Sequence, residues 1–167
     1  MRWERLFAEL EAQGEDLERE ERDVLVEELR DDDWARTSWR DLLGGRVAIE
    51  VRGAGRVEGS VVLVNERLLQ LSGPSGDHLV ATAAVTTVHS SERRGATPTR
   101  VEAALGWRQV LRALRDSGDD VRVRLVDGGL WEGTIDVVGR DFVRLRSPSG
   151  RDQVLPLAGI AVVSGRS

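Results

Sequence analysis

Two short segments of the sequence carry arginine at every second position, a spacing that would place the charges on one face of a β-strand. Arg122 and Arg124 alternate with apolar residues in the first segment, and Arg144 and Arg146 do so in the second. Guanidinium groups in such a row can follow a phosphate backbone. Trp131, which lies between the segments, is the best candidate for stacking on a base. These five residues form the candidate nucleic-acid-binding site, and a solvated strand face is the alternative explanation for the arginines.

Residue types that support catalysis or metal binding are few and scattered. The chain has no cysteine, which excludes disulfides, thiolate metal sites and thiol catalysis. His78 and His89 have no counterpart in the second half of the sequence, and solvated histidines explain them more simply than ligands do. The run Asp31–Asp33 suits the capping of a helix better than a cation site. We therefore predict no catalytic residue, no metal site and no cofactor, and we expect that the chain is not an enzyme.

Charge is distributed unevenly along the chain. Its 167 residues include 24 arginines, no lysine and 29 acidic residues, for a net charge of −5. Residues 1–43 hold 15 acids and 7 arginines, whereas 91–118 hold 3 acids and 6 arginines. An acidic leader and a mildly basic connector thus flank segments in which the two signs balance. No apolar run reaches the length of a membrane span and the first residues do not resemble a signal peptide, so we expect a cytoplasmic protein without a membrane partner.

A β-rich segment occurs twice. Residues Val47–Ser90 align with Val121–Ser164 without a gap, and glycine, proline and branched apolar residues recur at matching positions. Gly59 and Gly133 lie inside the second strand of each copy, where a missing side chain permits the bend that curls a sheet into a small barrel. We therefore predict two folding units, each curled around an interior of its own.

Alternating apolar and polar residues predict a set of short strands in each copy. We expect the strands at about 46–52, 56–64, 67–72, 77–82 and 85–89, and again at 120–126, 130–138, 141–147, 151–155 and 159–163. Helical spacing predicts a helix before each set, at 34–43 and 101–116, with Trp34 and Trp107 in similar places. Two further helices are expected in the leader, interrupted at Gly14, the second over 16–30. The fold class is therefore mainly β with helices.

These elements divide the chain into four parts. They are an acidic helical leader at 1–33, a first helix-plus-barrel unit at 34–90, a linker at 91–99 and a second unit at 100–167. The leader has two interpretations. It is either a solvated helix that packs a thin apolar stripe on the barrels, or a dimerising or partner-binding segment within residues 1–30.

The order of a helix, an alternating first strand, a bent second strand and a short strand pair resembles the Sm-like family, and within it the Hfq-type RNA chaperones. The resemblance covers Leu111–Val163 best and Trp34–His89 less well. The residues that carry it are Val121, Val123 and Leu125, the Asp127–Gly128 turn, Gly133 at the bend, Phe142–Val143 and Gln153–Val154. The ending VLPLAGIAVV is similar, more weakly, to the C-terminal barrel of the RimP family. The resemblance implies two tandem Sm-like units, each with a helix and a five-stranded, bent-sheet small barrel.

The nucleotide-binding residues of that family are not kept. Sm proteins have an Asp and then an Asn after the bent strand, where this chain has Gly139 and Val143-Arg144 in one copy and Asn65 and Leu69-Gln70 in the other. The Tyr-Lys-His run of Hfq is replaced by Pro156-Leu157-Ala158 and Thr82-Ala83-Ala84. An RNA ligand would therefore use another surface, for which the arginines and Trp131 are the candidates.

The resemblance also implies self-association, because the fourth strand of one Sm-like unit pairs with the fifth strand of its neighbour and such edges are open. Pro156 removes one donor near the end of a fourth strand, which weighs against a full ladder. We expect a non-catalytic tandem Sm-like binding module, an RNA-associated regulator that assembles through strand edges. The alternative is a protein–protein scaffold without nucleic-acid binding, which uses the acidic leader.

Overall fold

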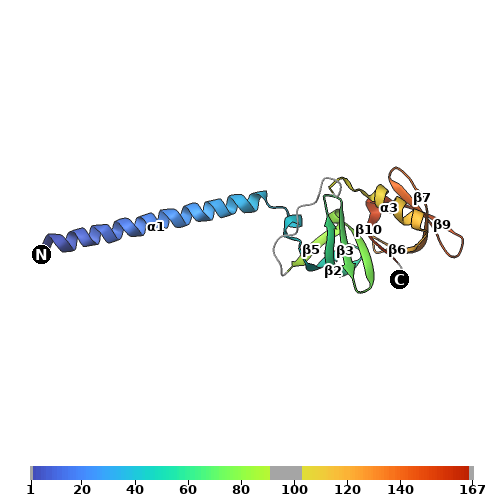
Figure 1. Cartoon of the computed structure of the whole chain (residues 1–167), viewed down its shortest axis with the longest axis horizontal. Coiled ribbons are helices and arrows are strands. Elements are labelled where there is room, and N and C mark those ends of the chain that lie inside the picture. The colour runs from blue at the N-terminus through green and yellow to red at the C-terminus, as the bar shows by residue number, and fades with distance from the viewer. Residues whose placement is uncertain (1, 91–102, 166–167) are drawn as a thin grey trace. The chain divides into compact units, whose positions relative to one another are not determined.

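The computed structural model describes residues 2–90 and 103–165, and the side chains of 17–89 and 103–165. The chain divides into two compact units, Met1–Ser38 and Trp39–Ser167, and each is described by itself. Figure 1 labels the helices and strands, and its numbering is used throughout.

The first unit consists of one helix, α1, which runs from Arg2 to Arg36. Its residues are mostly Glu, Arg, Leu and Ala, which favour helices, and an internal glycine costs only about 1 kcal/mol relative to alanine. The predicted interruption at Gly14 is therefore wrong. Within the described residues, no helix is both long and apolar enough to span a membrane.

The predicted helix over 34–43 is also wrong. Asp31–Asp33 lie inside α1 rather than at the start of a new helix, and the backbone N–H of Thr37 donates to the carbonyl of Trp34 at 3.1 Å where α1 ends. A short 3₁₀ turn, η1 (Trp39–Leu42), follows. Trp39 packs against the core of the sheet whereas Trp34 is exposed, so Trp39 and not Trp34 is the counterpart of Trp107.

The second unit is dominated by strands, as predicted, and every expected strand forms within two residues of its predicted bounds. The first five are β1 (Arg46–Val51), β2 (Gly55–Val64), β3 (Leu68–Gly73), β4 (Gly76–Ala81) and β5 (Val85–Ser90). The second five are β6 (Asp120–Leu125), β7 (Leu130–Val138), β8 (Phe142–Arg146), β9 (Asp152–Pro156) and β10 (Ile160–Gly165). One-turn 3₁₀ helices, η2 (Thr82–Ala84) and η3 (Leu157–Gly159), precede β5 and β10.

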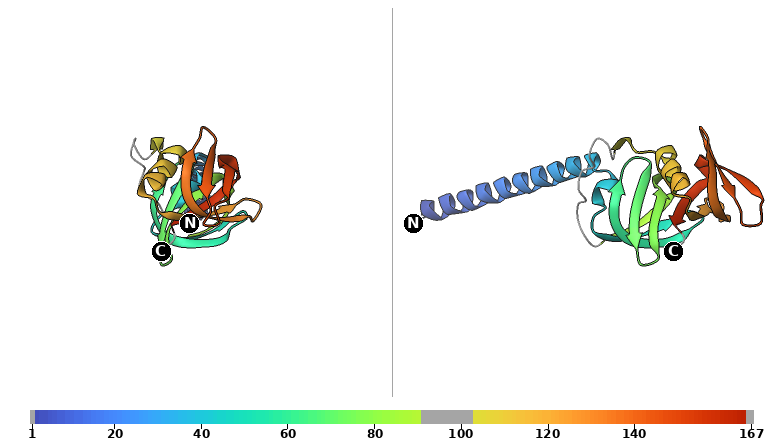
Figure 2. Two further views of the ribbon diagram at one scale, coloured as in Figure 1. Left: turned by 90° about the vertical axis from the view of Figure 1, so that its right-hand side faces the viewer. Right: turned by 45° about the vertical axis from the view of Figure 1, so that its right-hand side comes forward.

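The strands form one antiparallel sheet in the order β5-β1-β2-β3-β4-β10-β6-β7-β8-β9. Its two halves have the same topology, and Figure 2 shows curved strands in both. The halves join at β4 and β10, where Val80 pairs with Val162 and Leu79 pairs with Val163. The hydrogen-bonded ladder is therefore continuous from β5 to β9, so the two predicted folding units share one sheet.

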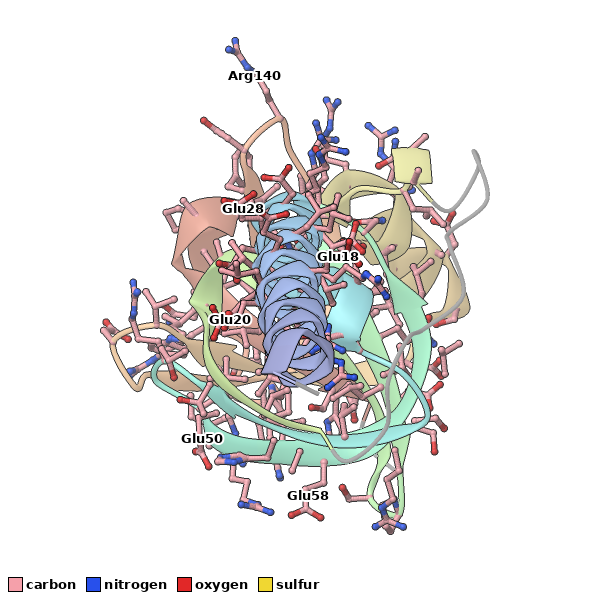
Figure 3. All side chains as sticks on the ribbon, turned by 90° about the vertical axis from the view of Figure 1, so that its left-hand side faces the viewer. Glu18, Glu20, Glu28, Glu50, Glu58 and Arg140 are labelled. Atoms are coloured by element: carbon pink, nitrogen blue, oxygen red, sulfur yellow. The ribbon has the colours of Figure 1, made fainter. Side chains whose placement is uncertain are left out.

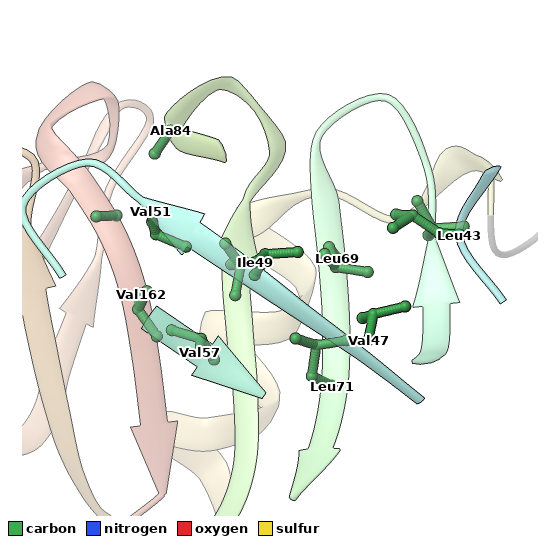
Figure 4. Close-up of a cluster of buried hydrophobic side chains, with 12 residues drawn as sticks. Leu43, Val47, Ile49, Val51, Val57, Leu69, Leu71, Ala84 and Val162 are labelled. Carbon is green, nitrogen blue, oxygen red and sulfur yellow. The ribbon is translucent and has the colours of Figure 1, made fainter. Parts of the chain in front are cut away.

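Each half nevertheless has its own hydrophobic core, and the two cores lie on opposite faces of the sheet. Successive residues of a strand point to opposite faces. Accordingly Val80 and Val162 pack in the first core, whereas Leu79 and Val163 pack in the second. Figure 4 shows Val162 from β10 among the side chains of the first core. Each half of the sheet thus contributes part of one strand to the core of the other half.

Gly59 and Gly133 occupy the same place in the two halves. They pair with Val47 and Val121, and a Cβ atom at either position would press on the backbone of the next strand. It would lie 2.8 Å from the carbonyl oxygen of Ser72 in the first case and would overlap that of Arg146 in the second. Glycine therefore lets the third strand approach the second closely in both halves of the sheet.

The second strand of each half of the sheet also carries a β-bulge two residues beyond this glycine. The register shifts between Val61 and Leu63 in β2 and between Ile135 and Val137 in β7. These positions are equivalent in the internal repeat. A bulge bends its strand and increases the local twist, so the bend predicted for both copies has two causes.

The internal repeat contains one insertion that the sequence alignment missed. Ser72 pairs with Asp77 across the hairpin of the first half of the sheet, whereas Arg146 pairs with Asp152 in the second half. The second hairpin is one residue longer. Beyond this hairpin, equivalent residues of the two halves are separated by one position more than before it. Val80 therefore corresponds to Leu155, and Val88 corresponds to Val163.

The second unit also contains α3 (Trp107–Ser117), whose Leu111 is fully buried in the second core. The backbone N–H of Gly106 donates to the side chain of Gln109 at 3.2 Å, and Gly118 ends the helix with φ of 72°. The predicted helix began at residue 101, and 101–102 lie outside the described residues. Residues 103 and 104 are helical but Leu105 and Gly106 are not, so the predicted helix is interrupted before α3 begins at Trp107.

Candidate functional site

The four candidate arginines lie on the outer face of the second half of the sheet, the face opposite its core. Arg122 and Arg124 are on β6, and Arg144 and Arg146 are on β8. Each pairs with a group of the protein. Arg122 donates from Nε to Oε1 of Glu132 at 2.7 Å, across the β6–β7 pair.

Arg144 and Arg146 share one carboxylate. Arg144 donates to Oδ2 of Asp136 from Nε at 2.9 Å and also from its terminal nitrogen, and Arg146 lies 3.3 Å from the same oxygen. Asp152 on β9 lies 3.9 Å from Arg144 and 3.8 Å from Arg146. The hydrogen bond from Arg144 lowers the pKa of Asp136, and the charge of Arg146 lowers it further. The predicted basic stripe is therefore a mixed-charge network.

Arg124 has a structural role. Its guanidinium donates to the carbonyl oxygen of Ala54 at 2.9 Å, in the β1–β2 hairpin of the other half. This contact helps to hold the two halves of the sheet together. The carbonyl oxygen at that point of the hairpin gives Arg124 an acceptor within the fold, so it contributes little to a phosphate-binding row.

Trp131 does not lie on the face that carries the arginines. It pairs with Val123, a fully buried core residue, and directly paired residues of an antiparallel ladder point to the same face. Its side chain is 37% exposed at the core-facing side of β7. The sequence pattern left the face of Trp131 open because it does not reveal the partner on β6. The structure thus brings the arginines together but separates the stacking candidate from them.

His78, interpreted from the sequence as a solvated histidine, lies half-buried at the junction of the two halves. Its Nδ1 is 2.7 Å from the hydroxyl of Ser164 on β10, and its Nε2 is 3.2 Å from that of Ser75. Burial lowers the pKa of His78, and the positive charge of Arg124 lowers it further. His78 therefore acts as a neutral hydrogen-bonding partner across the junction.

The other polar candidates have structural explanations. His89 lies on β5 with its Nε2 3.7 Å from Glu50. Asn65 is buried, accepts hydrogen bonds from the backbone of Arg67 and Leu68, and donates to the carbonyl of Leu105 at 3.0 Å. Among the described residues, no group of three or more acidic, histidine or cysteine side chains could hold a metal ion.

Two strand edges remain open in the described part of the chain, one on β5 and one on β9. Their equivalents, β10 and β4, pair with each other at the junction. Leu79 on β4 is 8% exposed because it packs into the neighbouring core, whereas Val154, at the same place on β9, is 58% exposed. The open edge of β9 thus presents an apolar side chain at a position that is an interface elsewhere in the molecule.

The helix α1 presents a second candidate surface. Leu17, Val24, Leu25 and Leu29 are exposed on it. Acidic side chains surround them, and Glu18, Glu20 and Glu28 are labelled in Figure 3. Arg22 forms an ion pair with Glu18 at 3.4 Å. The surface is strongly acidic, with scattered apolar side chains between the charges.

Comparison of the sequence with models of protein families gives no match, and comparison with curated proteins gives none either.

Proposed function

We propose that the chain is a non-catalytic, tandem Sm-like binding module that self-associates through its open strand edges. One observation carries this proposal: two topologically equivalent halves of the sheet pair through β4 and β10, while the equivalent strands β9 and β5 have open edges among the residues that the structure describes. A strand edge with free backbone groups and an exposed apolar side chain is a template for pairing with another strand.

Measurement of the mass in solution tests this part of the proposal. Sedimentation equilibrium of the full chain is expected to give a mass above that of one 18.4 kDa chain, increasing with protein concentration. A single-chain mass at every concentration up to the millimolar range would remove self-association from the proposal.

RNA is the ligand that the resemblance implies, and the arginine network of β6 and β8 is the surface proposed for it. A phosphate group there must displace the carboxylates of Asp136 and Glu132 from their arginines. We therefore expect weak binding that falls steeply as salt is added, because the affinity would come from counterion release.

The test is a salt titration of single-stranded RNA binding by the wild type and by the double variant Arg144→Glu, Arg146→Glu. The variant is expected to lose binding at low salt. Arg46→Glu with Arg56→Glu, on the first half of the sheet, makes the same change in charge and serves as the matched control. Tight binding that the first double variant leaves unchanged would contradict the arginine surface.

A protein–protein scaffold is the second candidate function, favoured by the exposed apolar and acidic side chains of α1. Such a surface suits a basic protein partner better than a nucleic acid. The scaffold predicts no RNA binding even at low salt. Binding of RNA that survives removal of α1 would favour the first proposal over this one.

A further inference from the structure

We infer that a second copy of this chain docks on β9 through its own β9, so that two chains form a two-fold symmetric dimer rather than a ring or a filament. The inference rests on the proposed self-association and specifies which edges meet. Two copies could repeat the β4–β10 junction by pairing β9 of one copy with β5 of the next. The residues that would meet in that pairing differ from those of the β4–β10 junction.

The junction within the chain buries apolar side chains from both halves of the sheet. From β4, Leu79 packs into the second core. From the other half, Ala161 and Val162 on β10 are buried in the first core, and Val126 packs against it. These side chains, together with the paired backbones of β4 and β10, hold the two halves as one compact unit.

A head-to-tail repeat of this junction would place β5 of a second copy on β9. Polar residues would then stand at the positions from which Ala161, Val162 and Val126 enter the neighbouring core. By the internal repeat, Thr86 and Thr87 stand where Ala161 and Val162 do, and Arg52 stands where Val126 does. Burial of an arginine and of two hydroxyl groups against an apolar core is unfavourable unless each finds a partner. The β5 edge is therefore unsuited to receive β9.

Two further contacts of the junction would be lost in such a repeat. Arg124 donates to the carbonyl of Ala54, whereas its equivalent Glu50 has no proton to donate to a carbonyl oxygen. The β1–β2 hairpin meets β6 at Gly53, where a Cβ atom would overlap the backbone oxygen of Leu125. The equivalent of Gly53 is Asp127, which carries a side chain. The residues of the β4–β10 junction thus suit the pairing of these two strands and not the pairing of β9 with β5.

The β9 edge, in contrast, suits a second β9. The backbone N–H of Leu157 donates to the carbonyl oxygen of Asp141 at 2.8 Å, so the backbone groups of Leu157 point toward β8. Because this direction alternates along a strand of an antiparallel ladder, the backbone groups of Val154 and Asp152 point to the open edge. Antiparallel pairing about a two-fold axis at Val154 places the two exposed valines side by side. Pro156 has no N–H to donate, which ends the ladder and keeps it short.

Single-cysteine cross-linking of the full chain tests this arrangement, because the natural sequence has no cysteine. Directly opposed residues in an antiparallel pair have Cα atoms about 4.5–5.5 Å apart, within the roughly 4.4–6.8 Å range that a disulfide requires. Val154→Cys alone is expected to form a disulfide-linked dimer on mild oxidation, and Val88→Cys alone is not.

A mixture of the two variants, with a mass tag on one, distinguishes the alternatives. Head-to-tail pairing would join Val154→Cys to Val88→Cys and neither variant to itself, which would overturn the inference but leave the proposed self-association intact. The inferred dimer gives only the Val154→Cys homodimer.

The mass in solution provides the second measurement. Val154→Arg is expected to halve the wild-type mass, whereas Val62→Arg, at an equally exposed apolar position away from the edges, is expected to leave it unchanged. A dimer that survives Val154→Arg would overturn the inference and show that another surface joins the chains. A monomeric wild type would overturn both the inference and the self-association on which it rests.

Discussion

At the residue scale, the bend of each second strand depends on a position that has no room for a side chain. Gly133 faces the backbone of Arg146 so closely that an added Cβ atom would overlap the carbonyl group. Backbone cannot rotate away as the end of a long side chain can, so the strands must separate to admit a methyl group. Separation would loosen the pairing of β7 with β8, on which the Arg144–Asp136 contact also depends.

Replacement of this glycine measures the cost. Gly133→Ala is expected to lower the free energy of unfolding by about 1–3 kcal/mol, the usual cost of overpacking. Gly159→Ala is the control, since a Cβ atom there would meet no neighbour, and its effect is expected within about 0.5 kcal/mol. Urea unfolding followed by tryptophan fluorescence gives both values. Equal values for the two variants would contradict the close approach.

His78 gives the junction a dependence on pH. Burial, with the charge of Arg124, lowers the pKa of His78 in the folded chain below its unfolded value of about 6.5. The folded state therefore binds fewer protons than the unfolded state in the range between the two values. Stability is full above the unfolded pKa and is lost as the pH falls from there through the folded pKa.

This dependence can be measured by the urea midpoint between pH 7 and pH 5. The midpoint of the wild type is expected to fall more steeply toward pH 5 than that of His78→Gln, which keeps hydrogen-bonding atoms but does not titrate. The same slope in the wild type and in His78→Gln would show that the junction does not sense this histidine.

At the element scale, the junction of β4 with β10 and the open edge of β9 form a natural matched pair. Leu79 and Val154 occupy equivalent positions, yet only Leu79 has a core to enter. Leu79→Ala is expected to cost about 2–5 kcal/mol of unfolding free energy, as a buried leucine does. Val154→Ala is expected to change it by no more than about 0.5 kcal/mol at concentrations where the chain is monomeric. Denaturant titrations of both variants check this, and a cost for Val154→Ala comparable to that of Leu79→Ala would contradict the assigned burial.

The same elements show how far sequence reasoning reaches. Strand positions were predictable because alternation along a strand is local, as in Val47, Ile49 and Val51. The break at Gly14 was a local signal too weak to outweigh the surrounding helix formers. The face of Trp131, the extra residue between β8 and β9 and the exchange of Leu79 between cores depend on partners distant in sequence. No periodicity within one segment records them.

The candidate site divides in the same way. The arginines of β6 and β8 were predicted to share an outward face, and they do. Their neutralisation by Asp136 and Glu132 was not predictable, because it depends on which residues of β7 lie opposite. The open edges were expected from the resemblance. The polar character of the β5 edge becomes clear only when the internal repeat is used to compare β5 with β10 at the junction.

At the scale of the whole molecule, the buried apolar side chains and the excess of negative charge lie in different units. The buried apolar side chains of the described residues lie between Leu43 and Val163, in the unit Trp39–Ser167. The helix α1 holds 14 acidic residues and 6 arginines, so removal of residues 2–36 changes the net charge from −5 to +3. One truncation therefore tests the independence of the sheet and the influence of the acidic helix.

The chain without residues 2–36 is expected to unfold cooperatively, with a midpoint within about 4 °C of the full chain, since a domain of this size shifts by a few degrees per kcal/mol. Thermal circular dichroism in the β-sheet band checks this, and loss of a cooperative transition would show that α1 belongs to the core.

If the arginines of β6 and β8 bind RNA, the truncated chain should bind it more tightly than the full chain at low salt, because a repulsive charge of −8 has been removed. The difference should shrink as salt screens the charges, since the Debye length falls from about 30 Å at 0.01 M to about 8 Å at 0.15 M. No RNA binding by either form at the lowest salt would leave α1 as the partner-binding surface and favour the scaffold.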